Sequence, residues 1–410
     1  MERLTEVTAE DYNKGLCDFE GINWKNNLLT FRNHSIRLSK SFYRHLRYNI
    51  FTNYQDLQWN SKKIQKDITP VRDDGNFYKF RYSKLDTDSA INHFQLRNLL
   101  AVPTKNDVYY NAKDSIIHWN PITHESESIF DSSTLNVYSL TASKDLVAFG
   151  VRVGNYIICS INNPKIKKYE TIPRLNQTGT DGNQVDYAIN YMKFITNHTG
   201  KEELLIASND FFCRMTDMTT LKYTYEYEDT KAINCASLRN DGKSLLCVGD
   251  SKVTKLIDIT SNKEIQHIEE HYDYLFSCEW SPNGRYFVTG GQDRCARLYD
   301  FRNMSQSLNV LPMNVSSVRS VRFTDDNQYL AVAEHIDYVH IYDAAGGIIL
   351  REQVVDFFTE IAGIGFTPGD GHCLYISTVN TNIMNPNIVP TNGILMEFER
   401  CRFTRNDIFF

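Results

Sequence analysis

The chain has 410 residues, with 50 Asp and Glu against 44 Lys and Arg, so its formal net charge is −6. A charge this small does not by itself imply a nucleic-acid or membrane partner. Nine cysteines without a Cys-x-x-Cys pair favour free buried thiols in a reducing compartment over disulfides or zinc sites. The first residues lack the layout of a signal peptide, and no apolar run approaches the ~20 residues of a membrane span. We therefore predict a protein of the cytoplasm, the nucleus or both.

Residues 1–76 are predicted to form a basic leader that is partly helical. Residues 21–66 carry nine Lys and Arg against the single acid Asp56, a local charge of +8 that leaves −14 for the rest of the chain. Within 31–51, apolar residues recur at helical spacing and predict an amphipathic helix whose basic face carries Arg37, Lys40, Arg44 and Arg47. Two interpretations stay open. The helix packs on the rest of the fold with its charges in water, or these four side chains dock an acidic partner. The acidic remainder of the chain argues against nucleic acid.

Residues 77–85, FYKFRYSKL, alternate like a strand and precede a series of repeats. The clearest repeat unit is 276–309, which reads as four short strand-like runs separated by turn residues. The units before and after it have the same pattern. Each unit has a landmark pair at the end of its third strand: Trp119-Asn120, Ser160-Ile161, Thr216-Asp217, Ile257-Asp258, Tyr299-Asp300, Tyr342-Asp343 and Glu397-Phe398.

The landmark pairs are separated by 41, 56, 41, 42, 43 and 55 residues. Four of these steps match the period of about 40–45 residues that is typical of WD40 repeats. The two longer steps hold polar insertions around 173–185 and 380–392, which we interpret as loops. The pattern predicts an all-β, seven-bladed WD40 β-propeller over residues 77–402, followed by a tail at 403–410. The last unit lacks a fourth strand of its own, so we expect 77–85 to close the ring as its outer strand.

Motifs for catalysis are missing from the sequence. There is no phosphate-binding glycine loop, no Gly-x-Ser-x-Gly turn and no metal-ligand spacing among the 11 histidines. We predict no enzyme activity, no cofactor and no metal site. His271 lies just before the first strand of its unit, where we expect it to bond with Asp293, Thr289 and Tyr299 inside the blade.

Acidic and aromatic residues gather in the turns that surround one mouth of a propeller's channel. The candidates for a peptide-binding site there are Glu334, Asp337, Asp273, Tyr274, Glu360, Phe357, Phe358 and His335. Carboxylates with aromatic neighbours suit a cationic group, such as the free amino terminus of a peptide. The alternative stays open that turn aspartates such as Asp210, Asp250 and Asp293 only hold their turns, and that the two phenylalanines belong to the core.

Long strings of the chain resemble a largely uncharacterised WD40-repeat family of fungi and plants. They are DYLFSCEWSPNGRYFVTGGQDRCARLYDFRNMSQSLNVL, VRSVRFTDDNQYLAVAEHIDYVHIYD, DFFTEIAGIGFTP, HFQLRNLLAVPTKNDVYY and EGINWKNNLLTFRNHSIRLSKSFYRHLRYNIF. The resemblance covers roughly residues 20–402. A yeast member of this family is an exchangeable substrate receptor of the GID (CTLH) E3 ubiquitin ligase and recognises the N-termini of proteins to be degraded. Where the family often has Glu-Pro-Ala-Asp-Phe, this chain has Glu334-His-Ile-Asp-Tyr, which keeps the acids but changes the expected pocket wall.

The resemblance implies a non-catalytic substrate receptor that binds protein N-termini at an acidic channel mouth, with ligase subunits as further partners. The alternative is a general WD40 scaffold for a multiprotein complex, without recognition of a terminus. Both hypotheses place proteins or peptides among the partners, and neither involves a membrane.

Overall fold

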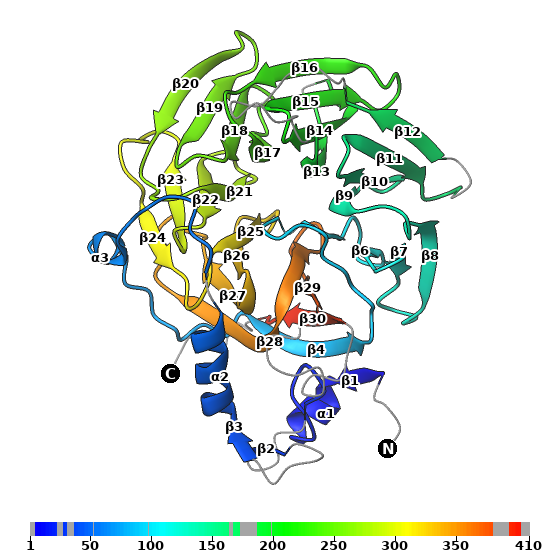
Figure 1. The fold of residues 1–410 in the computed structure, drawn as a ribbon, viewed down its shortest axis with the longest axis vertical. Helices are drawn as coiled ribbons and strands as arrows, with labels where there is room; N and C mark the ends of the chain where they lie inside the picture. The colour runs from blue at the N-terminus through cyan, green and yellow to red at the C-terminus, as the bar shows by residue number, and fades with distance from the viewer. Residues whose placement is uncertain are drawn as a thin grey trace.

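Four-stranded antiparallel sheets are arranged in a ring around a central axis in the computed structural model (Figure 1). The structure describes residues 5–22, 28–30, 37–51, 53–96, 98–163, 167–172, 187–197, 199–379 and 393–402. The two predicted loops and the tail 403–410 lie outside these residues.

The first five blades each use four consecutive strands, and the innermost strand comes first in the sequence. Blade 1 comprises β5 (Leu100–Ala101), β6 (Val108–Asn111), β7 (Ser115–Trp119) and β8 (Ser126–Asp131). Blade 2 comprises β9 (Val137–Ala142), β10 (Leu146–Val151), β11 (Asn155–Ser160) and β12 (Lys167–Thr171). Blade 3 comprises β13 (Ile189–Thr196), β14 (Glu202–Ser208), β15 (Phe212–Asp217) and β16 (Tyr223–Glu228). Blade 4 comprises β17 (Ile233–Leu238), β18 (Ser244–Gly249), β19 (Thr254–Asp258) and β20 (Lys263–Ile268). Blade 5 comprises β21 (Leu275–Trp280), β22 (Tyr286–Gly291), β23 (Cys295–Asp300) and β24 (Asn309–Pro312).

Blades 6 and 7 are joined by one long strand. Blade 6 contains β25 (Val318–Phe323), β26 (Tyr329–Glu334), β27 (Ile336–Asp343) and the first part of β28 (Glu352–Phe366). The second part of β28 is the inner strand of blade 7, and it pairs with β29 (Cys373–Val379), which pairs with β30 (Ile394–Arg400). The change of partner occurs at Glu360, which pairs with both Ile336 and Val379.

The ring is closed by β4 (Tyr78–Leu85), which pairs antiparallel with β30 from Ile394↔Leu85 to Arg400↔Tyr78. Residues 77–85 therefore take the outer-strand position of blade 7 that the sequence predicted. The third-strand landmarks are also confirmed, because six of them end a third strand and Glu397-Phe398 lies within β30.

The burial pattern explains why these sequences form blades. Every residue of β22 and β23 in blade 5 is buried, since both faces of an inner strand are covered by neighbouring blades. By contrast, β20, the outermost strand of blade 4, has mainly exposed residues, and only its Ile268 is buried. As predicted, His271 is buried within blade 5, where its Nδ1 lies 2.9 Å from Asp293 Oδ2 and its Nε2 lies 2.8 Å from Thr289 Oγ1. The predicted bond with Tyr299 is not formed, because both ring nitrogens are engaged by these two side chains.

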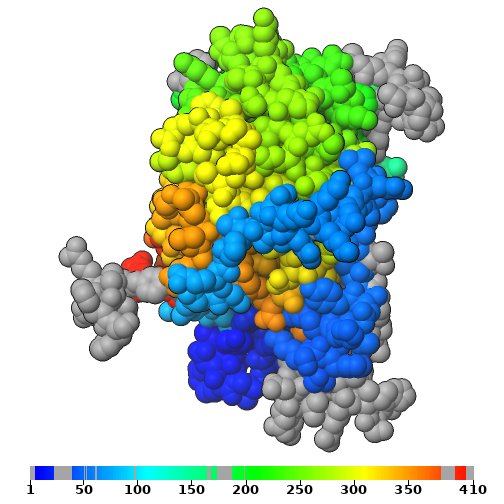
Figure 2. Space-filling model, turned by 90° about the vertical axis from the view of Figure 1, so that its left-hand side faces the viewer, coloured from blue at the N-terminus to red at the C-terminus, as the bar shows by residue number. Residues whose placement is uncertain are grey.

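The leader contains β1 (Glu6–Thr8), α1 (Ala9–Asn13), β2 (Leu28–Thr30), β3 (Arg37–Ser39), α2 (Lys40–Ile50) and α3 (Ser61–Ile64). It starts at blade 7, where β1 pairs with the outer edge of β4. After α2 it crosses the face of the ring to blade 5, where Ile64 of α3 packs against Cys295 and Val310. Backbone hydrogen bonds then tie Thr69 to β24 and Arg72 to Leu350. Figure 2 shows this path as a blue to light-blue band across the side of the molecule. None of the described helices is long and apolar enough to span a membrane.

Candidate functional site

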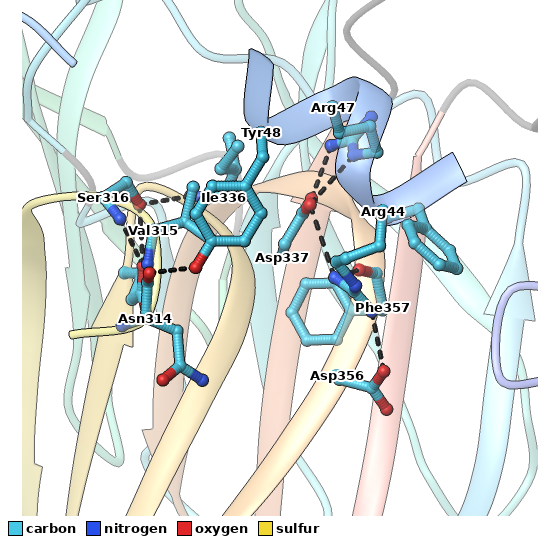
Figure 3. A network of polar contacts seen from close by, with 12 residues as sticks. Arg44, Arg47, Tyr48, Asn314, Val315, Ser316, Ile336, Asp337, Asp356 and Phe357 are labelled. Carbon is cyan, nitrogen blue, oxygen red and sulfur yellow. Dashed lines mark hydrogen bonds and ion pairs between the residues drawn. The ribbon is translucent and has the colours of Figure 1, made fainter. Parts of the chain in front are cut away.

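The predicted amphipathic helix is α2, and it lies over the junction of blades 6 and 7 (Figure 3). It begins where the Ser39 hydroxyl accepts a hydrogen bond from the Phe42 N–H at 3.1 Å, the usual way of capping a helix. Arg44 and Arg47 are three residues apart and therefore lie on one face of the helix. That face points toward the blades.

Arg47 forms a two-pronged pair with Asp337. Its Nε lies 2.9 Å from Asp337 Oδ2 and its Nη2 lies 2.5 Å from Asp337 Oδ1. The two side chains are only 3% and 1% exposed, so this is a buried ion pair. Burial raises the pKa of Asp337, while the hydrogen bonds from Arg47 act in the opposite direction. Such a pair is geometrically specific, and removal of either partner leaves a buried charge.

Arg44 fixes the same helix to β28. Its Nη2 lies 2.6 Å from Asp356 Oδ2, and its Nη1 donates to the Phe357 carbonyl oxygen at 2.9 Å. The guanidinium also lies 4.1 Å from the centroid of the Phe358 ring, within the range of a cation–π contact. Lys40 adds a longer and more exposed pair to Asp356 at 3.5 Å.

Glu334 is completely buried and holds the turn before β25. Its carboxylate accepts backbone N–H bonds from Asn314 at 2.7 Å, Val315 at 2.9 Å and Ser316 at 2.5 Å. The same carboxylate lies 3.0 Å from Nε2 of the buried His340. Burial alone would lower the pKa of His340, but hydrogen bonds to Glu334 and Glu352 raise it to about 9.

Asp273 binds the leader at a second place. Its carboxylate accepts N–H bonds from Asp56 at 3.2 Å and Leu57 at 2.9 Å, and from the Trp59 indole at 2.9 Å. The segment after α2 is thereby held over blade 5. Burial is the main cause that raises the pKa of Asp273.

These contacts correct the expectation that the acidic rim is open to a ligand. The carboxylates of Glu334, Asp337 and Asp273 are occupied by groups of the same chain, because the leader covers them. Both interpretations of the basic helix also need correction. The guanidinium groups of Arg44 and Arg47 bind carboxylates of the chain's own blades, so they are neither in water nor available to an acidic partner. The side chain of Arg37 lies outside the described residues.

The other predicted mouth residues are also placed by these contacts. Glu360 lies 2.8 Å from His335 Nε2, and the two side chains are largely buried. Phe357 and Phe358 are 1% and 2% exposed, which agrees with the alternative that they belong to the core. Tyr274 is half-buried beside Asp273 and remains close to the channel mouth.

The leader creates a different surface over the channel. Tyr54 and Phe94 are 57% and 63% exposed, and their rings meet edge to face with centroids 6.1 Å apart. Asp56 lies beside them and accepts a long hydrogen bond from Gln95 Nε2 at 3.4 Å. Together with Asp250 and Tyr274, the residues Tyr54, Asp56 and Phe94 form what we call the central surface.

The central surface contains two partly desolvated carboxyl groups, those of Asp56 and Asp250. Burial first, and then the charge of Asp273, raise the pKa of Asp56 to about 6. Burial also raises the pKa of Asp250, which accepts a hydrogen bond from Asn234 at 2.9 Å. Neither Asp56 nor Asp250 forms an ion pair with a described residue. A cation that binds between them would relieve their mutual repulsion.

Side chains narrow the channel below the central surface. Leu96 and Asn98 lie among the first residues of the inner strands of blades 3 to 6, including Asn190, Phe276 and Arg319. The cavity between them has a volume of about 10 Å³, which is space for about one water molecule. The described residues also contain no group of three or more His, Cys, Asp or Glu arranged to hold a metal ion.

Sequence reasoning missed Tyr54 and Phe94 because no repeat places them, and it noted Asp56 only as the single acid of the leader. The complementary charges of the leader and the rim were the signal that could have brought the two together.

We predict that Arg47→Ala lowers the free energy of unfolding by about 3 kcal/mol or more, because it leaves Asp337 buried without its partner. Urea unfolding followed by tryptophan fluorescence measures the change. The matched control is Lys40→Ala on the same helix, whose exposed pair should contribute less than about 1 kcal/mol. Equal losses in the two variants would contradict the assignment.

The raised pKa of His340 predicts a pH dependence of stability. The ordinary pKa of histidine is 6.5 and the pKa of His340 in the folded protein is about 9, so the stabilisation is complete below pH 6.5 and is lost as the pH rises through about 9. The unfolding free energy of His340→Gln should fall less over this interval than that of the wild type. Parallel curves for the two proteins would show that another group causes the dependence.

Comparisons with known proteins agree with this fold. The family described as "WD domain, G-beta repeat" matches residues 262–300. An uncharacterized protein of Schizosaccharomyces pombe is 24% identical over 274 residues, which cover 62% of this chain and 75% of that protein. Protein SOF1 of Saccharomyces cerevisiae is 31% identical over 120 residues, 28% of this chain and 24% of SOF1. A chain in the crystal structure of the mitotic checkpoint complex has a TM-score of 0.64 at 14% identity, with 82% of this chain and 95% of that chain covered, and so shows the fold alone. The chain thus carries a WD40 repeat within a WD40-type β-propeller and has distant fungal relatives.

Proposed function

We propose that this propeller is a non-catalytic protein-binding subunit whose central surface holds a cationic group of a partner. The observation that carries the proposal is the position of Asp56 next to the exposed rings of Tyr54 and Phe94, where the charges of Asp273 and Asp250 both act to raise its pKa. Carboxylates pair with an ammonium group, and aromatic rings cover the apolar atoms next to it. The cavity beneath has a volume of only about 10 Å³, so we expect the contact to be made at the mouth.

In its finer form, the proposal is that the partner's group is a free amino terminus and that the protein is a substrate receptor of a GID-type E3 ubiquitin ligase. The resemblance of the leader and blades to that family supports this form. The residues that would meet the ammonium are those of the central surface, since Glu334 and Asp337 are engaged with the chain itself.

A general scaffold is the second candidate. Large apolar side chains are exposed on separate blades, at Ile122 (70%), Tyr169 (66%) and Ile265 (51%). Scattered exposed apolar residues are common on protein surfaces, but their distribution around the ring would allow several partners to bind at once.

We predict that short peptides with neutral side chains and a free amino terminus bind the protein, and that acetylation of the terminus abolishes binding. Asp56→Asn and Asp250→Asn should each weaken binding about tenfold, equivalent to about 1.4 kcal/mol. Binding should strengthen as the pH rises through about 6, because Asp56 must be ionised to pair with the ammonium. Isothermal titration calorimetry measures all three effects.

The exposed leader residue Asp73 provides a control, since Asp73→Asn removes the same charge away from the central surface. Equal binding of free and acetylated peptides would refute recognition of an amino terminus. Peptides with an internal lysine that bind as well as free termini would place the cation on a side chain.

The ligase role predicts that subunits of a ubiquitin ligase copurify with the tagged protein in affinity purification with mass spectrometry. Their recovery should persist in Asp56→Asn, because a receptor binds its ligase and its substrate through different surfaces. Recovery of other complexes without any ligase subunit would favour the scaffold.

A further inference from the structure

A side groove lies between the outer strands of blades 6 and 7, beneath α1, with a volume of about 520 Å³. Its aromatic wall includes Tyr12, Phe19, Phe80 and Phe398. The rings are in mutual contact, for example Phe19 and Phe80 with centroids 4.8 Å apart. Tyr12 is 39% exposed, so part of this aromatic wall is open.

The opposite wall of the side groove is an uncovered strand edge. N–H and C=O groups of alternate residues point to opposite sides of a strand. In β28 the groups of Glu352 point away from β27, since its N–H donates to Arg72 O at 2.9 Å and its C=O accepts from Gly75 N at 2.8 Å. By the same alternation, the groups of Val354 and Asp356 point into the groove.

The leader covers this edge on both sides of the gap. Residues 72–75 pair with it at Glu352, and the Glu20 carboxylate accepts the Phe358 N–H at 2.9 Å. Between these two points, the backbone groups of Val354 and Asp356 have no hydrogen-bond partner among the described residues. An open strand edge is a template for another strand.

Gln353 shows what such a strand would meet. Its side-chain amide spans from β28 to β4, where Oε1 accepts the N–H groups of Phe77 at 2.7 Å and Tyr78 at 2.8 Å, and Nε2 donates to Tyr78 O at 2.6 Å. The side-chain amide of Gln353 thus occupies one end of the gap and forms the hydrogen bonds that a peptide unit of an added strand would form there. Farther along β4, the pairing with β1 covers only residues 82–84.

The last described residues of the chain lie beside this groove. The Cys401 N–H donates to Phe77 O at 2.7 Å, and Asn76 beside it lines the groove. Residues 403–410, Phe-Thr-Arg-Asn-Asp-Ile-Phe-Phe, include four large apolar side chains. Fully extended, they span about 26 Å, which is enough to run the length of a strand. Burial of these side chains against the aromatic wall is favourable.

We propose that the side groove binds an extended peptide as an added strand, and that its occupant is residues 403–410 of the same chain. The backbone of the segment pairs with Val354 and Asp356, and Phe409 and Phe410 pack against the aromatic wall.

The test compares the full chain with a variant that ends at Arg402, using amide hydrogen exchange. We expect the amides of Val354 and Asp356 to exchange about tenfold faster in the shortened protein, whereas those of β20, the outer strand of blade 4, stay unchanged. Circular dichroism controls for the fold of the shortened protein. Equal exchange at Val354 and Asp356 in the two proteins overturns the proposal.

A synthetic peptide of residues 403–410 provides an independent measurement. It should bind the shortened protein and restore slow exchange at both amides, while a peptide with Phe409→Ala and Phe410→Ala should not. Absence of binding by the unmodified peptide overturns the groove as its site. Slow exchange that depends on protein concentration, together with a dimer in light scattering, overturns the same-chain occupant in favour of a second copy.

Discussion

The pairing of β4 with β30 is the contact on which the whole ring depends. It joins residues more than 300 positions apart, as the bond of Arg81 to Glu397 across 316 positions illustrates. Contacts of this range carry a large cost in chain entropy and slow the folding of a domain. Once formed, the pairing covers the edge of β30, at which the last blade would otherwise pair with other molecules.

The leader shares this closure by binding at several points along its path. It pairs with β4 through β1, fixes α2 on blades 6 and 7 through two arginines, and packs α3 on blade 5. The basic leader and the acidic body, which look like separate surfaces in the sequence, meet in the folded chain, where Lys40, Arg44 and Arg47 pair with Asp337 and Asp356. Buried ion pairs give little net stability, so the value of Arg47 and Asp337 lies in fixing one position of the helix.

The sequence was sufficient to predict the features that depend on local pattern. The blades follow from alternation and repeat spacing, the helix from its apolar period, and the His271 contacts from the position of that residue in its repeat. The closing position of 77–85 followed from counting, since the last unit was one strand short.

The candidate site could not be predicted in the same way. Arg47 and Asp337 are separated by 290 residues, and no spacing rule relates two charges across such a distance. A helical period identifies the face that carries Arg47 but not the partner of that face. Asp56 lies at the channel mouth because the Asp273 carboxylate binds the N–H groups of Asp56 and Leu57. This contact joins residues more than 200 positions apart, so only the folded chain reveals it.

The continuous strand β28 also determines how the molecule would respond to a mechanical load. Neighbouring blades elsewhere are separate sheets, so a force across those junctions acts on side-chain packing. At the junction of blades 6 and 7, the same force acts along one backbone that is hydrogen-bonded to β27 on one side and to β29 on the other. The strands of these two blades belong to one continuous sheet. A partner that pulls on the leader would transmit its force directly to this segment, because α2 is anchored there by Asp337 and Asp356.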